Sequence, residues 1–73
     1  MFRDTKRINN DTEEFTVDLR LGGIDRTFLI RVTKAGAQNL VVLVGATRKS
    51  RFDRVQGEFR KAFDTFQVDR GQP

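Results

Sequence analysis

The chain has 73 residues, a net charge of +4, and neither cysteine nor histidine. A domain of this length has a thin core, because it buries only about 60% of the surface that its unfolded chain exposes. Disulfides, thiolate chemistry, histidine metal ligation and histidine acid–base catalysis are excluded. The positive charge favours an acidic partner: nucleic acid, anionic lipid or protein. No apolar run approaches the roughly 20 residues of a membrane span, and we expect no targeting segment in this sequence.

The first half of the chain predicts two strands joined by a tight turn. Residues 1–12 are expected to form an irregular N-terminal extension, and the domain itself is expected over residues 13–68. Apolar and polar residues alternate strictly over residues 14–21, which indicates a strand with one buried and one wet face. Gly22-Gly23 then ends this strand with a turn. A second half-buried strand follows over residues 26–33, with Thr27, Leu29, Arg31 and Thr33 on one face and Phe28, Ile30 and Val32 on the other.

The glycine-containing segment 34–38 predicts a hairpin loop before a third strand. Residues 40–46 are apolar throughout and rich in β-branched side chains. A strand of this composition is typical of a sheet whose two faces are both covered. We therefore expect residues 40–46 to form the central strand.

The C-terminal third predicts an amphipathic helix. Apolar side chains recur at helical spacing and fall within one narrow stripe, so this face should pack on the sheet. Ser50 and Asp53 have capping-box spacing, which places the helix start near Ser50. Residues 67–68 should leave the helix, and residues 69–73 should form a frayed tail. The predicted fold class is α+β, an antiparallel sheet of about three strands with a C-terminal helix on one face. Its predicted core consists of Phe28, Ile30, Val32, Leu40, Val42, Val44, Phe52, Val55, Phe59, Phe63 and Phe66.

A cluster of basic residues at the start of the helix is the candidate binding site. Arg48, Lys49, Arg51 and Arg54 lie where the helix dipole disfavours cations, so they are either solvated surface or a partner-binding surface. The chain is not expected to be an enzyme, because its acidic residues fall on predicted polar faces. No metal ligands are predicted. The phenylalanine stripe is interpreted as core rather than as a stacking platform, since no aromatic pair is expected on an open sheet face.

Several elements together resemble the C-terminal part of the PsbP-type extrinsic proteins of oxygenic photosynthesis. They are the strand and glycine turn "RTFLIRVTKAGAQ", the second apolar strand ending in Gly45-Ala46, the basic-aromatic element of residues 49–52, and the closing "TFQV" of residues 65–68. Phe52 stands where the family commonly has tryptophan, and Thr65 where it commonly has serine. The resemblance implies part of an α/β/α sandwich. A full family domain also has an N-terminal half with further strands and a helix, which residues 1–12 cannot supply.

The resemblance implies a non-catalytic extrinsic subunit, peripheral to the thylakoid membrane on its lumenal side in the chloroplast. Its partners would be membrane-embedded photosystem subunits, most simply those of photosystem II, where such proteins support oxygen evolution and the retention of calcium and chloride. No cofactor is expected in this chain, and calcium would belong to the family's complex. Two alternatives remain open: a PsbP-like subunit or assembly factor of photosystem I or of the NADH-dehydrogenase-like complex, and a small basic nucleic-acid-binding module that uses the four basic residues on phosphates.

Overall fold

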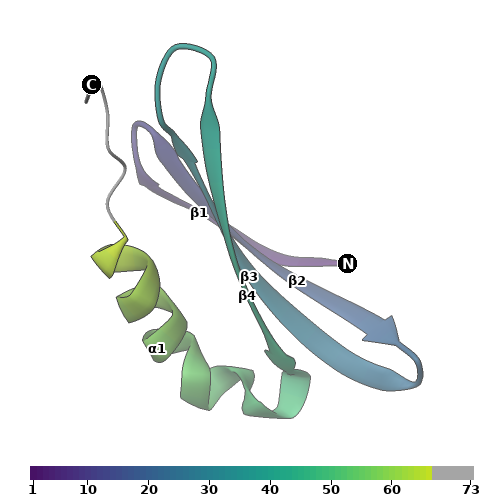
Figure 1. Cartoon of the computed structure of the whole chain (residues 1–73). Coiled ribbons are helices and arrows are strands. Elements are labelled where there is room, and N and C mark those ends of the chain that lie inside the picture. Colours follow the sequence, from purple (N-terminus) through teal and green to yellow (C-terminus); the bar gives the residue numbers. More distant parts are fainter. Residues whose placement is uncertain (67–73) are drawn as a thin grey trace.

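The computed structural model describes residues 1–66 as a four-stranded antiparallel sheet followed by one helix (Figure 1). The strands lie in chain order across the sheet, and each pairs with its sequence neighbour. The α+β class and the C-terminal helix are therefore confirmed. The elements are β1 (Phe2–Asn9), β2 (Thr12–Leu21), β3 (Ile24–Lys34), β4 (Leu40–Arg48), the 3-10 turn η1 (Lys49–Arg51) and α1 (Phe52–Thr65).

Both predicted hairpins are present. Gly22 and Gly23 join β2 to β3 with φ angles of 59° and 79°. Two successive positive φ values are the requirement of a type I′ hairpin turn, which glycine meets without steric cost. Residues 35–39 join β3 to β4, and the Ala35 N–H closes this loop by donating to the Asn39 carbonyl oxygen at 2.9 Å. The turn chemistry of the sequence therefore places β2, β3 and β4 correctly.

Two predictions about the sheet are wrong. Residues 2–9, expected to be irregular, form β1 and pair with β2 across two register shifts. β4, expected at the centre, lies at the edge of the sheet. The consecutive hairpins explain its position, since the chain leaves β4 directly through η1 into the helix and no further strand of residues 1–66 pairs with it.

The helix begins later than its capping signal predicts. Ser50 lies inside η1, α1 begins at Phe52, and its N-cap residue Arg51 makes no side-chain capping hydrogen bond. The capping-box prediction is therefore wrong. Phe66, expected in the helical stripe, is the extended C-cap residue. The expectations for residues 67–68 and for the tail 69–73 lie outside the described residues.

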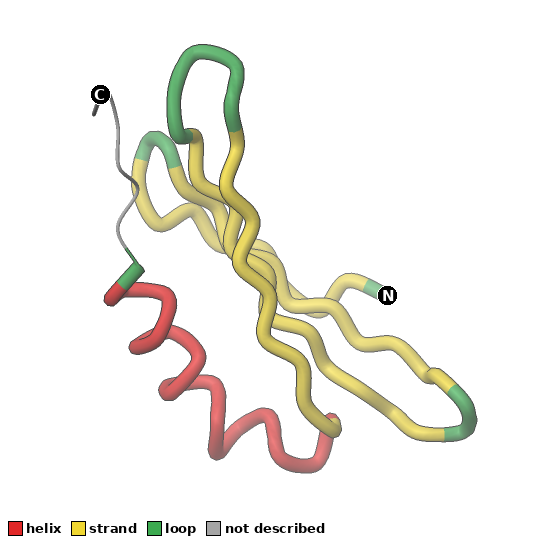
Figure 2. Tube along the Cα trace, in the orientation of Figure 1, coloured by secondary structure: helices red, strands yellow, loops and turns green. Residues whose placement is uncertain are grey.

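The helix covers the polar face of the sheet. In Figure 2, α1 runs along one side of the strands. The side chains buried on the sheet in residues 1–66 are Thr12, Glu14, Thr16, Thr27, Leu29 and Arg31, which share this face in the strand register. We call it the helix-covered face.

The predicted core is wrong in part. Leu29, which was not part of it, is 0% exposed, and Phe52 at 3% is the other buried hydrophobic residue in the described chain. The predicted core residues of β4 are exposed, with Leu40 at 66%, Val42 at 54% and Val44 at 56%. Among the other predicted core residues, Phe66 is exposed. Those that are half-buried are Phe28, Ile30, Val32, Val55, Phe59 and Phe63.

The contact between Gly45 and Phe59 explains how the helix fits on this face. A Cβ atom at Gly45 would lie 2.8 Å from Cγ of Phe59, so only glycine leaves room for the ring. Gly45 is paired with Leu29 in the register, on the helix-covered face. β4 is apolar on both of its faces, and this one glycine makes one face flat enough to accept the helix.

Candidate interaction surfaces

A network of charged side chains, with Glu14 and Arg31 buried at its centre, joins the helix to the sheet. The Glu14 carboxylate is 2% exposed and lies opposite Arg31 in the β2–β3 register. Arg31 donates to Glu14 Oε2 from Nη2 at 2.9 Å and to Asp64 Oδ1 from Nη1 at 2.6 Å. Arg60 of α1 donates to Glu14 Oε1 at 2.9 Å. Glu14 therefore holds one arginine from the sheet and one from the helix.

This network is fully paired and keeps Arg31 charged. Burial by itself would lower the pKa of Arg31. Its hydrogen bonds to Asp64 and Glu14 outweigh burial, so the pKa of Arg31 lies above its ordinary value. The Arg31 guanidinium also lies 5.4 Å from the centroid of the Phe63 ring. Sequence reasoning missed this network. The available signal was the opposite charge of Glu14 and Arg31, which lie in neighbouring predicted strands on the face that alternation marks as wet.

A second polar cluster lies further along the same face. The Thr27 hydroxyl donates to Asp18 at 2.6 Å, and Arg3 forms a bidentate pair with the same carboxylate at 2.8 and 2.9 Å. The hydrogen bond from Thr27, followed by that from Arg3, lowers the pKa of Asp18 below its ordinary value. The Arg3 guanidinium lies 5.1 Å from the centroid of the Phe52 ring. This cluster therefore ties β1 to the start of α1.

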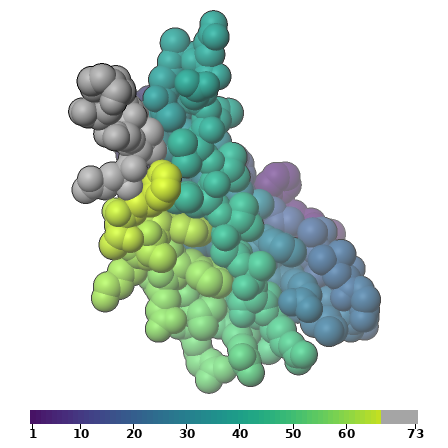
Figure 3. Space-filling view, viewed as in Figure 1, coloured from purple at the N-terminus to yellow at the C-terminus, as the bar shows by residue number. Residues whose placement is uncertain are grey.

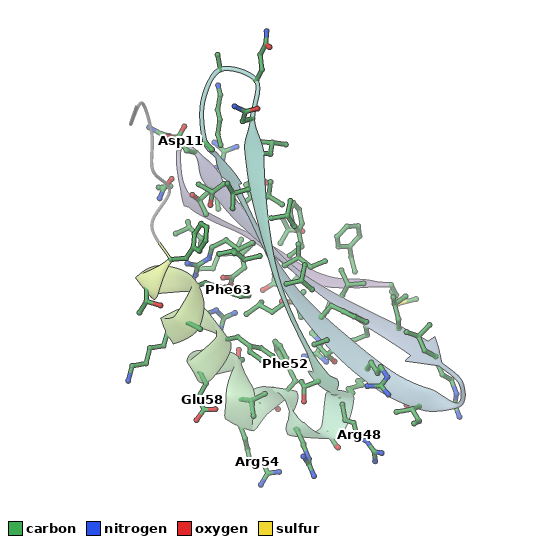
Figure 4. The ribbon with its side chains drawn as sticks, viewed as in Figure 1. Asp11, Arg48, Phe52, Arg54, Glu58 and Phe63 are labelled. Atoms are coloured by element: carbon green, nitrogen blue, oxygen red, sulfur yellow. The ribbon has the colours of Figure 1, made fainter. Side chains whose placement is uncertain are left out.

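The predicted basic cluster is brought together at one end of the molecule. Arg48, Lys49, Arg51 and Arg54 are all exposed, and they lie where β4 passes through η1 into α1. Figure 4 shows Arg48 and Arg54 directed away from the sheet, whereas Phe52 and Phe63 point towards it. Within residues 1–66, no ion pair is formed by Arg48, Arg51 or Arg54, and Lys49 acts only electrostatically, on Asp18. The cluster is therefore available to an acidic partner.

The side of the sheet opposite α1 is largely apolar, and no element within residues 1–66 covers it. We call it the apolar sheet face and define it by the residues that alternate away from the helix. β4, at the edge of this face, lies at the surface beside α1 in Figure 3. The apolar residues of this face are Phe2, Phe15, Val17, Leu19, Phe28, Ile30, Val32, Leu40, Val42 and Val44, and the register also places Arg7, Glu13, Arg26, Lys34 and Arg48 on it, towards its margins.

The apolar sheet face also carries aromatic residues, contrary to the expectation from sequence. The rings of Phe2 and Phe15 pack with their centroids 5.9 Å apart. Phe28 lies opposite Val17, which is itself opposite Phe2. The expectation that no aromatic pair lies on an open sheet face is therefore wrong, because the helix covers the other face.

One large hollow lies between the end of α1 and the β1–β2 turn. It has a volume of about 720 Å³, and its lining includes Asp11, Thr33, Arg31 and Asp64. Its central cation, Arg31, is already paired with Glu14 and Asp64. In residues 1–66, no three potential metal-ligating side chains gather at one place. Over the same residues, no helix is long and apolar enough to cross a bilayer.

The chain was compared with known proteins. No family model matches it, and no curated protein or solved structure shows significant similarity to it.

Proposed function

We propose that this protein is a non-catalytic docking subunit that binds an acidic surface of a larger assembly through its basic cluster. The observation that carries this proposal is the exposure of Arg48, Lys49, Arg51 and Arg54 at one end, with three of them free of ion pairs in the described chain. Electrostatic complementarity of this kind orients partners and raises their association rate. The helix dipole does not account for these cations, since the start of a helix favours anions.

The chemistry of the other polar groups supports a role without catalysis. Glu14 and Asp18 each accept hydrogen bonds from arginine and lie under or beside the helix. A general acid or base needs a carboxylate that can exchange a proton with a substrate, whereas these two carboxylates hold the fold together. Their interactions join strands to one another and to α1.

We further propose that the larger assembly is a photosynthetic membrane complex. The support is the resemblance of residues 49–52 and the neighbouring elements to the PsbP-type proteins, together with an arrangement that suits docking: Phe52 is buried at the junction while Lys49 and Arg51 stay exposed. In this proposal the chain is an extrinsic lumenal subunit of photosystem II that supports oxygen evolution through calcium and chloride retention. Photosystem I and the NADH-dehydrogenase-like complex are the alternative partners. The α/β/α sandwich of the family would require a further segment of protein that covers the apolar sheet face.

Charge reversal within the basic cluster tests this proposal. The double variant Arg48→Glu, Arg51→Glu should lose binding to salt-stripped thylakoid membranes and keep its fold, because exposed charges contribute little to stability. The matched control is Lys6→Glu, Lys61→Glu, which changes the net charge equally at exposed positions outside the cluster. Membrane binding is measured by co-sedimentation, and folding by circular dichroism. Equal binding by both double variants and the parent would reassign the cluster to solvated surface.

The aromatic residues of the apolar sheet face favour one second candidate, a single-stranded nucleic-acid-binding module. Phe2, Phe15 and Phe28 could stack bases, and the basic cluster could contact phosphates. For this candidate, a fluorescently labelled oligonucleotide should bind the parent in a salt-dependent manner, and both the double charge reversal and Phe28→Ala should weaken binding. Oligonucleotide binding without membrane binding would replace the docking proposal with this candidate.

A further inference from the structure

We propose that the apolar sheet face is the interface of a symmetric homodimer, in which two copies of this chain stack face to face with their helices outside. This inference concerns the sheet, where only Arg48 of the basic cluster reaches the margin of the face, and it does not depend on the proposed function. Its first support is the small core of the single chain. Only Leu29 and Phe52 are buried hydrophobic residues in the described chain, whereas Leu19, Leu40, Val42 and Val44 are exposed.

The shape of the molecule agrees with an uncovered layer. The radius of gyration is 13.6 Å, whereas a compact domain of this length would have about 11 Å. A chain this small needs an additional source of stability, and it has no disulfide. Its remaining residues, 67–73, contain Val68 as their one large apolar side chain. These residues are too poor in apolar groups to cover the face by themselves.

The area of the face is sufficient for a stable dimer. The sheet has four strands. Strands about 4.8 Å apart and about nine residues long, at about 3.3 Å per residue, form a face of roughly 570 Å². Two such faces bury roughly 1,100 Å², which exceeds the approximately 1,000 Å² expected of a specific interface. Two sheets stack about 10 Å apart with their strands rotated by about 30°, an angle that arises from the twist of each sheet.

The composition of the face favours a second copy over nucleic acid. Its central row, formed by Phe15, Ile30 and Val44, carries no charge. At one margin, Arg7 donates to Glu13 at 3.3 Å and is therefore already paired. At the opposite margin, Arg26 pairs with Arg48 in the register, so the charged residues lie at the ends of the face and not in its centre. A face with an apolar centre and charged margins has the anatomy of a protein interface. The uncharged centre of this face is also complementary to itself, as a two-fold interface requires.

The charge distribution selects one orientation of the two copies. The basic cluster lies at the end of β4, beyond the apolar residues. A two-fold axis in the plane of the interface and perpendicular to the strands places the two clusters at opposite ends of the dimer. This arrangement avoids repulsion between the clusters and leaves both exposed.

The experiment compares the association state of the full chain with that of single variants of the central row. Sedimentation equilibrium across the micromolar range should show the parent converting from 8.4 kDa to twice this mass. Val44→Lys places a charge from each copy at the interface and should raise the dimer dissociation constant at least about tenfold. The matched control Ala62→Lys adds the same charge to an exposed position of α1 and should dimerise like the parent.

A second variant covers the case in which the lysine disturbs folding. Val44→Thr keeps the β-branched shape and introduces only a hydroxyl, so it should fold and still weaken the dimer. Circular dichroism checks that each variant is folded. A parent that stays monomeric across the range, or a Val44→Lys variant that dimerises as tightly as the parent, would overturn the proposal. So would an oligonucleotide that binds the face without competing against dimerisation.

Discussion

The two faces of this sheet differ in a way that reverses the usual relation between polarity and burial. The helix-covered face carries Glu14, Arg31 and several threonines, yet these side chains are the buried ones. The apolar sheet face carries phenylalanine, valine, isoleucine and leucine, yet much of it is exposed. Paired charges can occupy an interior when their hydrogen bonds are satisfied, and within residues 1–66 no buried side-chain polar atom lacks a partner.

The difference shows that the two faces are stabilised by different means. On the helix-covered face, Arg60 and Asp64 of α1 pair with Glu14 and Arg31, and the Phe59 ring rests on Gly45. These contacts require specific partners in specific positions. On the apolar sheet face, burial alone would stabilise the side chains, and any flat apolar surface of sufficient area could provide it. The first face therefore specifies the position of the helix, and the second provides the driving force for association.

The largest effect on the free energy of unfolding is expected at Glu14. Its neighbour Glu13 lies on the opposite face of the sheet and provides the comparison. Glu14→Gln keeps the side chain's size but leaves Arg31 with Asp64 alone, so it should reduce the free energy of unfolding by about 3–5 kcal/mol. Glu13→Gln removes only an exposed ion pair with Arg7 and should cost less than about 1 kcal/mol. Urea denaturation at one fixed protein concentration measures both.

Two further results would sharpen the assignment of Glu14. Replacing both charges together, in Glu14→Leu, Arg31→Met, should cost less than Glu14→Gln, because no uncompensated charge stays buried. Similar denaturation midpoints for the Glu14→Gln and Glu13→Gln variants would show that the network under the helix contributes no more than a surface pair.

The intermediate effect is expected at Gly45. Gly45→Ala would bring its Cβ to 2.8 Å from the Phe59 ring and displace the helix. Overpacking of this kind costs about 1–3 kcal/mol. Gly57→Ala is the matched control, because a Cβ there meets nothing within 4 Å and the residue lies inside α1. This control should stabilise the protein by about 0.5–1 kcal/mol.

A companion variant identifies the cause of the Gly45 effect. If the clash with the ring is responsible, then Phe59→Leu should lower the cost of Gly45→Ala in a double-mutant cycle. A Gly45→Ala variant as stable as the parent would mean that α1 does not rest on this glycine.

The smallest effect on stability is expected from lowering the pH, through protonation of the Asp18 carboxylate. The folded pKa of Asp18 lies below its ordinary value of 3.8 because of the Thr27 and Arg3 hydrogen bonds. A carboxylate with a lowered folded pKa adds stability above its unfolded pKa, and this contribution is lost as the pH falls through the folded pKa. Asp18→Asn should therefore be less stable than the parent near neutral pH, and this difference should shrink below about pH 4.

Thermal melting of both proteins across this pH range measures the effect. Asp25→Asn serves as the control, since Asp25 forms only an exposed pair with Arg20 at 3.7 Å. A parent and an Asp18→Asn variant that differ by the same amount at every pH would contradict the role assigned to the Asp18 carboxylate.

The sequence by itself determined the local elements. Period-two alternation placed β2 and β3, the Gly22-Gly23 pair placed the turn between them, and the apolar run placed β4. Helical spacing of phenylalanines placed α1, although not its first residue. The four basic residues were also found from the sequence, because closely spaced cations at a predicted helix start are a local feature. These signals depend on residues that are close together in the sequence, so they can be recognised without the tertiary structure.

The tertiary structure decided which face of the sheet the helix covers, and with it the core. β4 is apolar on both faces, so its sequence does not choose between them. The choice depends on the space that Gly45 leaves for Phe59 and on the pairing of Glu14 and Arg31 with residues of α1 far along the chain. Burial follows from such long-range contacts, whereas periodicity records only that two faces differ in polarity. For this reason the alternation separated the residues of the two faces correctly, but the core of the sheet was assigned to the face that the helix does not cover.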